Sequence, residues 1–266
     1  MATVNSVYEF LDRIAPVEHK AEKDNVGLLV GRRERELSKI LVSLDITDDA
    51  ISEAADEGAG LIVSHHPVLF SLSSITDSDV TGRRLLKLIE NGIAAICMHT
   101  NLDTAQGGVN DVLAALAGIQ DPLPLSDNGK TPEGGFSCGR FGCLQNPVPM
   151  SEYLPKLVTA LDTPAVRYHD SGRGVFRVAV AGGAGGSDFS CVLKQECDTF
   201  ITADIKYDMF LEAKELGINL IDGGHFCTEN VIIPPLADKL REAFPDVAVT
   251  VSKRHGRTTE FYINPS

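Results

Sequence analysis

The residues in this sequence whose types suit chemistry are histidines and carboxylates that follow short apolar segments. His65 and His66 come directly after the run Leu61–Val63, two residues of which are β-branched, and before Pro67. The apolar run predicts a buried strand, and Pro67, which has no backbone N–H, predicts that the sheet ladder stops there. Adjacent strand residues point to opposite sides, so both imidazoles can serve one region only beyond the strand's end. The alternative is a pair of ordinary polar turn residues.

Two later segments repeat this arrangement. A strand predicted over residues 93–98 is followed by His99 and Asp103, again at the strand's carboxyl end. A third apolar segment leads through two glycines to His225 and Glu229. If a helix has begun by His225, these two side chains share one helix face, which is the spacing of paired metal ligands.

The three strand ends together offer candidate metal ligands: His65, His66, Asp103, His225 and Glu229. Imidazole and carboxylate groups suit borderline divalent ions such as zinc, iron or manganese. These five ligands are more than a single catalytic ion needs, because such an ion keeps one coordination position open. The set suits two divalent metal ions bridged by a carboxylate. Taken singly, Glu229 has the alternative of offsetting a helix dipole and Asp103 that of a turn residue.

Predicted strands and helices alternate along the chain, which is the signature of an α/β fold. Residues 120–136 contain three prolines and three glycines and few apolar residues, so a domain boundary is expected there. We predict two α/β domains with mixed sheets flanked by helices. The metal-binding domain is expected to comprise residues 1–124 plus 204–266, with residues 125–203 inserted into it. Its last predicted strands cover residues 247–251 and 259–263.

Composition narrows the function class. The chain has 266 residues, a net charge of -13 and a pI of about 4.9. So acidic a chain argues against nonspecific nucleic-acid binding, which needs clustered Lys and Arg, and suits a protein that concentrates cations. The absence of a secretory signal and of a membrane-length apolar run argues against export and membrane insertion. The six cysteines form no CxxC pair, so free thiols in a reducing cytoplasm are expected.

Weaker motifs have simpler interpretations. The glycine-rich segment 181–186 lies between a predicted strand and helix but does not satisfy GxGxxG, so a packing turn is favoured over a nucleotide loop. The basic run 253–257 is interpreted as a solvated hairpin tip rather than an anion contact. Ser64 lies beside two histidines but is not surrounded by the G-x-S-x-G motif of a nucleophile elbow.

The chain resembles the NIF-three-like (YbgI-like) dinuclear metal proteins, often labelled GTP cyclohydrolase I type 2 homologues. The resemblance spans nearly the whole sequence. Its motifs are Asp24-Asn25-Val26-Gly27-Leu28, Ser64-His65-His66-Pro67, His99-Thr100-Asn101-Leu102-Asp103, Gly107-Gly108-Val109-Asn110-Asp111, Thr202-Ala203-Asp204-Ile205-Lys206-Tyr207 and Gly224-His225-Phe226-Cys227-Thr228-Glu229. The combination of His-His-Pro with the later Gly-His-x-x-Thr-Glu is quite specific.

The resemblance implies a two-domain α/β subunit whose first domain is completed by the C-terminal third, two divalent ions per subunit, and a homohexameric ring. Carried over by position, His66 and Asp103 would hold one ion, His65 and His225 the other, and Glu229 would bridge them. The sequence departs from the family pattern at Asp208, where relatives commonly have His. Substrate preference is therefore not carried over with the ligands.

The sequence thus predicts a metal-dependent hydrolase that acts on a small, nucleotide-like substrate. A carboxylate bound to metal is not free to act as a general base, so that role falls to His99, Asp208 or hydroxide itself. Two alternatives stay open. One is a non-catalytic metal-binding or scaffold ring protein, and the other is hydrolysis of phosphate esters by the same pair of ions.

Overall fold

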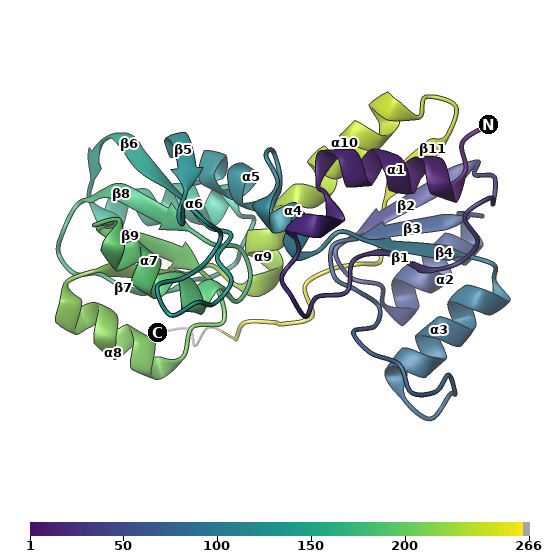
Figure 1. Cartoon of the computed structure of the whole chain (residues 1–266). Helices are drawn as coiled ribbons and strands as arrows, with labels where there is room; N and C mark the ends of the chain where they lie inside the picture. The colour runs from purple at the N-terminus through teal and green to yellow at the C-terminus, as the bar shows by residue number, and fades with distance from the viewer. Residues whose placement is uncertain (263–266) are drawn as a thin grey trace. The chain divides into compact units, whose positions relative to one another are not determined.

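The structure is a computed structural model, and it describes residues 1–262. The chain divides into two compact units, each built around its own sheet (Figure 1). Within the described residues, unit 1 comprises residues 1–106 and 232–256, and unit 2 comprises residues 107–231 and 257–262. Mixed sheets flanked by helices confirm the predicted α/β class.

The sheet of unit 1 has the strand order β1-β4-β3-β2-β11. Its strands are β1 (Gly27–Val30), β2 (Lys39–Ser43), β3 (Leu61–Ser64), β4 (Ala94–Cys97) and β11 (Ala248–Val251). Strands β11, β2, β3 and β4 are parallel, and β1 pairs antiparallel with β4 at one edge. Every residue of β3 and β4 is buried, as expected for parallel strands covered on both faces.

Helices cover both faces of this sheet, with α1 and α10 on one face and α2 and α3 on the other (Figure 1). The helical segments of unit 1 are α1 (Val4–Ile14), η1 (Val17–His19), α2 (Asp48–Asp56), α3 (Val80–Glu90), α4 (Thr100–Thr104) and α10 (Ile233–Ala243). The Thr47 hydroxyl accepts a hydrogen bond from the backbone N–H of Ala50, which caps α2 as its sequence predicts. One core cluster joins Leu41 and Ile62 of the sheet to Ile51 of α2 and Leu85 of α3.

The sheet of unit 2 has the order β5-β6-β8-β9-β10-β7. Its strands are β5 (Gln120–Pro124), β6 (Arg140–Val148), β7 (Arg167–His169), β8 (Val175–Val180), β9 (Thr199–Thr202) and β10 (Asn219–Asp222). Strands β8, β9 and β10 are parallel, and the outer strands are antiparallel to their neighbours.

Two hydrophobic clusters lie on the two faces of this sheet. The helical segments of unit 2 are α5 (Val109–Leu116), α6 (Met150–Ala160), η2 (Gly185–Asp188), α7 (Phe189–Lys194), α8 (Tyr207–Leu216), α9 (His225–Glu229) and η3 (Asn230–Ile232), which extends into unit 1. Helices α5, α6 and α9 contribute to one cluster, with Leu113, Leu157 and Cys227 among its members. Helices α7 and α8 contribute to the other, with Phe189 and Ala213.

The compact units divide at residues 106/107, 231/232 and 256/257, whereas the domain boundaries expected from the sequence lie at residues 124/125 and 203/204. Strand β5 lies within the proline- and glycine-rich segment, yet it pairs with β6 at the edge of the second sheet. Strand β10 pairs in parallel with β9, which keeps residues after 204 in unit 2. The proline and glycine content indicates where the chain turns. Strand pairing determines to which compact unit a segment belongs.

Two local predictions differ from the structure. No helix was predicted for the polar residues after β4, but Thr100–Thr104 form the short helix α4. The predicted strand 259–263 is wrong for residues 259–262, which are exposed and outside any strand, and Ile263 lies outside the described residues. The chain leaves the sheet earlier because the Glu53 carboxylate accepts hydrogen bonds from the backbone N–H groups of Lys253 and Arg254, which fixes a turn after β11.

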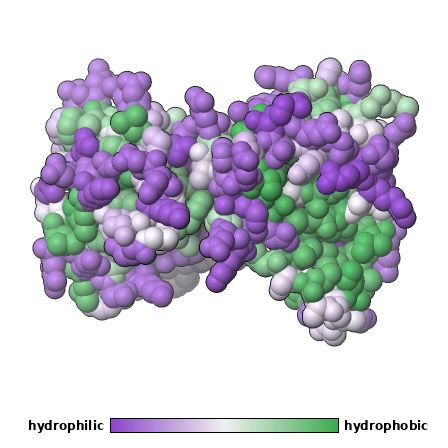
Figure 2. Space-filling view, viewed as in Figure 1, coloured by the Kyte–Doolittle hydropathy of each residue, from purple (hydrophilic) through white to green (hydrophobic). Residues whose placement is uncertain are grey.

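The surface contains one further feature that bears on function. In Figure 2, hydrophobic residues gather on the visible face of unit 1 over the region of β1 and α3. Exposed large hydrophobic side chains of this unit include Phe70, Leu72, Ile75, Val80 and Ile89.

Among residues 1–262, no helix combines the length and the apolar character needed to cross a membrane. The six cysteines are free thiols, as predicted.

Candidate metal centre

The parallel strands of unit 1 bring histidines from separate chain segments to one edge of the sheet. In the register of the ladder, Ser43 of β2 pairs with Ser64 of β3, which pairs with Cys97 of β4. The carboxyl ends of these strands therefore lie level. His65 and His66 follow β3 directly, and His99 follows β4 after one residue, so the segments leave the sheet at the same edge.

The three imidazoles form a compact group. Ring centroids are 5.0 Å apart for His65 and His66, 5.2 Å for His65 and His99, and 5.6 Å for His66 and His99. One nitrogen atom from each ring lies within 4.8 Å of the others, so the group could hold a metal ion. His65 is fully buried, whereas His66 and His99 are partly exposed.

Each of these imidazoles is oriented through its Nδ1 atom. The acceptors are the Met98 carbonyl for His65, Asp45 for His66 and Asp24 for His99, each at 2.8 Å. A carbonyl or ionised carboxylate oxygen can only accept, so in the neutral ring Nδ1 carries the hydrogen and Nε2 keeps its lone pair. Metal-binding histidines in proteins are held in this way by a second group behind the ring. The cluster therefore has the tautomers that a cation requires.

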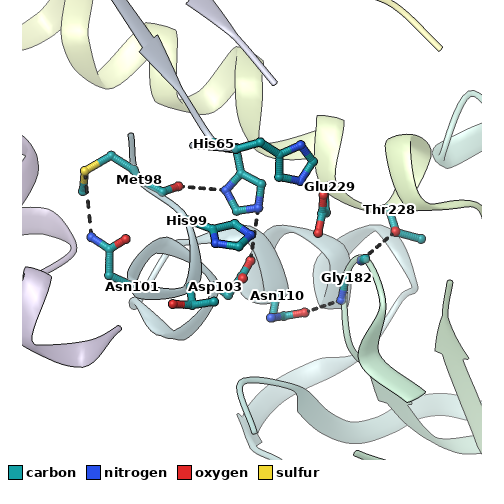
Figure 3. A network of polar contacts seen from close by, with 12 residues as sticks. His65, Met98, His99, Asn101, Asp103, Asn110, Gly182, Thr228 and Glu229 are labelled. Carbon is teal, nitrogen blue, oxygen red and sulfur yellow. Dashed lines mark hydrogen bonds and ion pairs between the residues drawn. The ribbon is translucent and has the colours of Figure 1, made fainter. Parts of the chain in front are cut away.

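Asp103 completes the group from α4 (Figure 3). Its Oδ1 atom lies 3.6 Å from Nε2 of His65, and both residues are buried. This separation is longer than a hydrogen bond between nitrogen and oxygen. It suits two ligand atoms that approach the same cation. The imidazole and carboxylate donors of unit 1 thus fit a divalent ion.

Asp24, which orients His99, is itself buried and heavily hydrogen-bonded. Its carboxylate accepts from the His99 ring, the backbone N–H of Thr100 and the Thr100 hydroxyl. Burial alone would raise its pKa, but these bonds and the nearby imidazole outweigh burial and hold the pKa of Asp24 well below its usual range. Asp24 is therefore an ionised acceptor that fixes the ring of His99.

Unit 2 presents a second pair of candidate ligands, His225 and Glu229, on one face of α9. The helix begins at His225 after Gly224, whose φ of +82° favours glycine, so the predicted helical spacing is confirmed. Nε2 of His225 lies 3.0 Å from Oε2 of Glu229, and Nδ1 lies 2.7 Å from Oδ2 of Asp204. The hydrogen bond to Glu229 outweighs burial and, with the charges of both carboxylates and the bond to Asp204, raises the pKa of His225 to about 9.

The glycine-rich segment 182–186 packs against this pair. The backbone N–H of Gly183 donates to the Thr228 hydroxyl at 3.0 Å, and that of Gly182 donates to Asn110 at 2.8 Å (Figure 3). A Cβ at Gly183 would lie 2.0 Å from Oε1 of Glu229. The backbone N–H groups of Gly182 and Gly183 thus already donate hydrogen bonds within the protein, which confirms a packing turn. The glycine is needed because the backbone closely approaches a candidate ligand.

Asp208, the other candidate base, lies exposed in the first turn of α8 in unit 2. The sequence did not single out Asp24, Asp45 or Asp204 as partners of particular histidines. Asp45 follows strand β2 after one residue, but neither its position nor that of the other two carboxylates identifies the ring that each one orients. Long-range contacts determine these pairs.

Comparison with known proteins gives consistent results. The family model described as Duf34/NIF3 (NGG1p interacting factor 3) matches residues 2–257. A protein of Clostridium perfringens named GTP cyclohydrolase 1 type 2 homolog is 34% identical over 261 residues, covering 97% of this chain and 99% of that protein.

Solved structures agree over nearly the full length. The Staphylococcus aureus hypothetical protein SA1388 has a TM-score of 0.88 and 26% identity, covering 98% of this chain and 99% of its own. Reduced HcgD from Methanocaldococcus jannaschii has a TM-score of 0.80 and 28% identity, covering 94% of this chain and 97% of its own.

Proposed function

Because the chain belongs to the Duf34/NIF3 family, we propose that it binds two divalent metal ions and hydrolyses a small, nucleotide-like substrate. The proposed ligands are His65, His66, Asp103, His225 and Glu229. The observation that carries the proposal is the shared orientation of the histidines, since each of these imidazoles and that of His99 has an oxygen acceptor at Nδ1. This arrangement suits metal binding through Nε2.

The ligand chemistry supports divalent ions of the zinc, iron or manganese type, which accept mixed imidazole and carboxylate ligands. When bound, such ions polarise substrate oxygens and make water more acidic. The chain's own contribution is to hold the ligands in fixed orientations. Met98 and Asp45 fix the adjacent rings of His65 and His66, and Asp204 fixes that of His225. Each orienting group reduces the freedom of the imidazole in front of it.

His99 is the residue that we propose to move a proton in the reaction. Asp24 holds the hydrogen on its Nδ1 atom, and a nitrogen of its ring belongs to the imidazole group of unit 1. Its Nε2 can therefore accept a proton from attacking water and return it to the leaving group. Asp208 is the second candidate for this role, because its carboxylate is exposed on α8.

The substrate class rests on relatives, several of which are named GTP cyclohydrolase 1 type 2 homolog. A nucleotide with a hydrolysable ring or phosphate ester is consistent with those names. The fold and the metal ligands do not determine whether a ring bond or a phosphate ester bond is hydrolysed. An assay must distinguish the two reactions. The predicted homohexameric ring and the cytoplasmic location are parts of the same proposal, and light scattering of the purified protein would measure the assembly.

The test is a hydrolysis assay of the metal-loaded protein with GTP. Opening of the purine ring would change its ultraviolet absorbance, whereas attack on an ester would release inorganic phosphate. We expect one of these signals in the wild type and at least about a hundredfold loss in His99→Ala with its metal retained. If both signals stay at background while the metal is bound, the hydrolase proposal fails and a non-catalytic metal-binding role replaces it. If His99→Ala also loses metal, His99 is a ligand rather than a base.

A further inference from the structure

The loop after His66 and Pro67 holds an aromatic ring beside the imidazole group. Within this loop Val68 is buried, Leu69 packs against the core of unit 1, and Phe70 is 63% exposed. The Phe70 and His99 ring centroids are 6.1 Å apart at an interplanar angle of 68°. A largely exposed ring of six carbons therefore lies next to a polar cluster.

The backbone beside Phe70 is anchored by the same turn that orients His99. The side-chain amide of Asn25 donates to the carbonyl of Leu69 at 2.8 Å, while the adjacent Asp24 accepts from His99 at 2.8 Å. The buried side chain of Val68 holds the loop from the other side of Leu69. One turn thus positions both the imidazole of His99 and the aromatic ring next to it.

We propose that Phe70 contacts the substrate and that its ring is the apolar surface on which a flat heterocycle of that substrate lies. The inference rests on the proposed function and adds to it the residue that recognises the ring. Scattered exposed hydrophobic residues are normal on proteins, so exposure alone carries no weight. What distinguishes Phe70 is its ring contact with His99 together with the anchored backbone beside it.

The chemistry of the two neighbours suits the two ends of a nucleotide. An aromatic face binds a nucleobase by stacking and tolerates different bases, because every base has a π face. The imidazoles and carboxylates suit the polar, hydrolysable part through bound cations. A substrate with a flat ring and a charged group would meet both kinds of surface.

The experiment compares two probes that differ by the base. Guanosine monophosphate and ribose 5-phosphate share the phosphate and the sugar, and only the first has a flat heterocycle. Their dissociation constants are measured calorimetrically with the zinc-loaded wild type and with Phe70→Ala and Phe70→Trp. Leu72→Ala is the matched control, since it removes an exposed apolar side chain from the same loop. The metal content of every sample is determined in parallel.

We expect the wild type and Phe70→Trp to bind the nucleotide about tenfold more tightly than the sugar phosphate, and Phe70→Ala to lose this preference, because stacking on an aromatic ring is worth about this much. The Leu72→Ala control should keep most of the preference for the nucleotide over the sugar phosphate. Equal nucleotide affinity in Phe70→Ala and wild type, or a wild type without preference for the base, would overturn the inference. Either result with full metal content leaves the metal proposal intact, whereas failure of the wild type to bind metal defeats that proposal separately.

Discussion

His99 and Asp24 lie 75 positions apart in the chain, yet Nδ1 of His99 is 2.8 Å from Oδ1 of Asp24. The contact joins the end of strand β4 to the turn before β1, and those two strands pair antiparallel at the edge of the sheet. Strand pairing therefore brings a buried carboxylate behind a histidine that the carboxyl end of the sheet already presents. In unit 2 the carboxylate of Asp204 likewise lies behind the ring of His225, at 2.7 Å from its Nδ1 atom, but Asp204 is exposed.

Replacing Asp24 by Asn should weaken both the fold and the hydrolytic activity. An amide cannot accept all four hydrogen bonds that the carboxylate now accepts from His99, Thr100 and the backbone N–H of Asn25. We expect the free energy of unfolding of the metal-free protein to fall by about 1–3 kcal/mol at pH 7. Hydrolysis by the metal-loaded protein should fall by about 10- to 100-fold, because Asp24 orients His99, the proposed base. Denaturant unfolding and the hydrolysis assay would measure the two effects.

The loss of stability should depend on pH in a defined direction. The pKa of Asp24 is lowered in the folded state. Its contribution to the free energy of unfolding is therefore present above the unfolded pKa, about 3.9, and is lost as the pH falls below that value. The wild type and Asp24→Asn should therefore converge in stability in acid. Asp45→Asn is the matched control, since Asp45 also accepts from a histidine but its side chain is 44% exposed. Its effect should be smaller, and equal stability of all three proteins at pH 7 would disprove the role of Asp24.

Gly183→Ala should disturb the ligand pair of unit 2. A Cβ at this position would lie 2.0 Å from Oε1 of Glu229, and the backbone has a φ of +63°. We expect zinc affinity to fall by at least about tenfold, because Glu229 must move away from its present position. Gly217→Ala provides the control, since Gly217 has a φ of +67° but no atom within 4 Å of the added Cβ.

Both glycine variants should lose about 1 kcal/mol of unfolding free energy through the unfavourable φ. Only Gly183→Ala should lose metal. Zinc titration of the two variants side by side separates the steric effect from the backbone effect. Unchanged zinc affinity in Gly183→Ala would show that the close approach to Glu229 does not matter for binding.

In the metal-free protein His225 should keep its second proton up to a pH of about 9. The hydrogen bond and charge of Glu229 are the main causes, so Glu229→Gln should lower the pKa towards the ordinary value of 6.5. A raised folded pKa stabilises the metal-free fold fully below the unfolded pKa, and that contribution is lost as the pH rises through about 9. NMR titration of the imidazole would measure the pKa in both proteins. A midpoint near 6.5 in the wild type would contradict the ion pair.

Much of the sheet of unit 1 is predictable because its signals are local. Apolar runs predict β2, β3 and β4, Thr47 predicts the start of α2, and Pro67 predicts the end of the β3 segment. The positions of His65, His66 and His99 after these strands follow directly. Since parallel strands end at a common edge, their convergence could also be expected.

The remaining features depend on contacts that no local pattern encodes. Helix α4 is five residues long and polar, so it has no helical periodicity to detect. Strand β5 is exposed and contains two prolines, which locally indicate a linker, but it pairs at a sheet edge where proline is tolerated. The pairing of Asp24 with His99 requires knowing that β1 lies beside β4. Such partners become visible only once the fold is known.

The central claim is that the chain binds divalent metal through two ligand clusters, one with His65, His66 and Asp103 in unit 1 and one with His225 and Glu229 in unit 2. Elemental analysis of the purified protein tests this claim most directly. The wild type is compared with His65→Ala and Glu229→Ala, and with His19→Ala and His169→Ala as histidine controls outside the clusters. We predict about two ions per chain in the wild type and the controls, and a clear reduction in both cluster variants. Less than about a tenth of an ion per chain in the wild type, even after incubation with zinc, iron and manganese, would contradict the account.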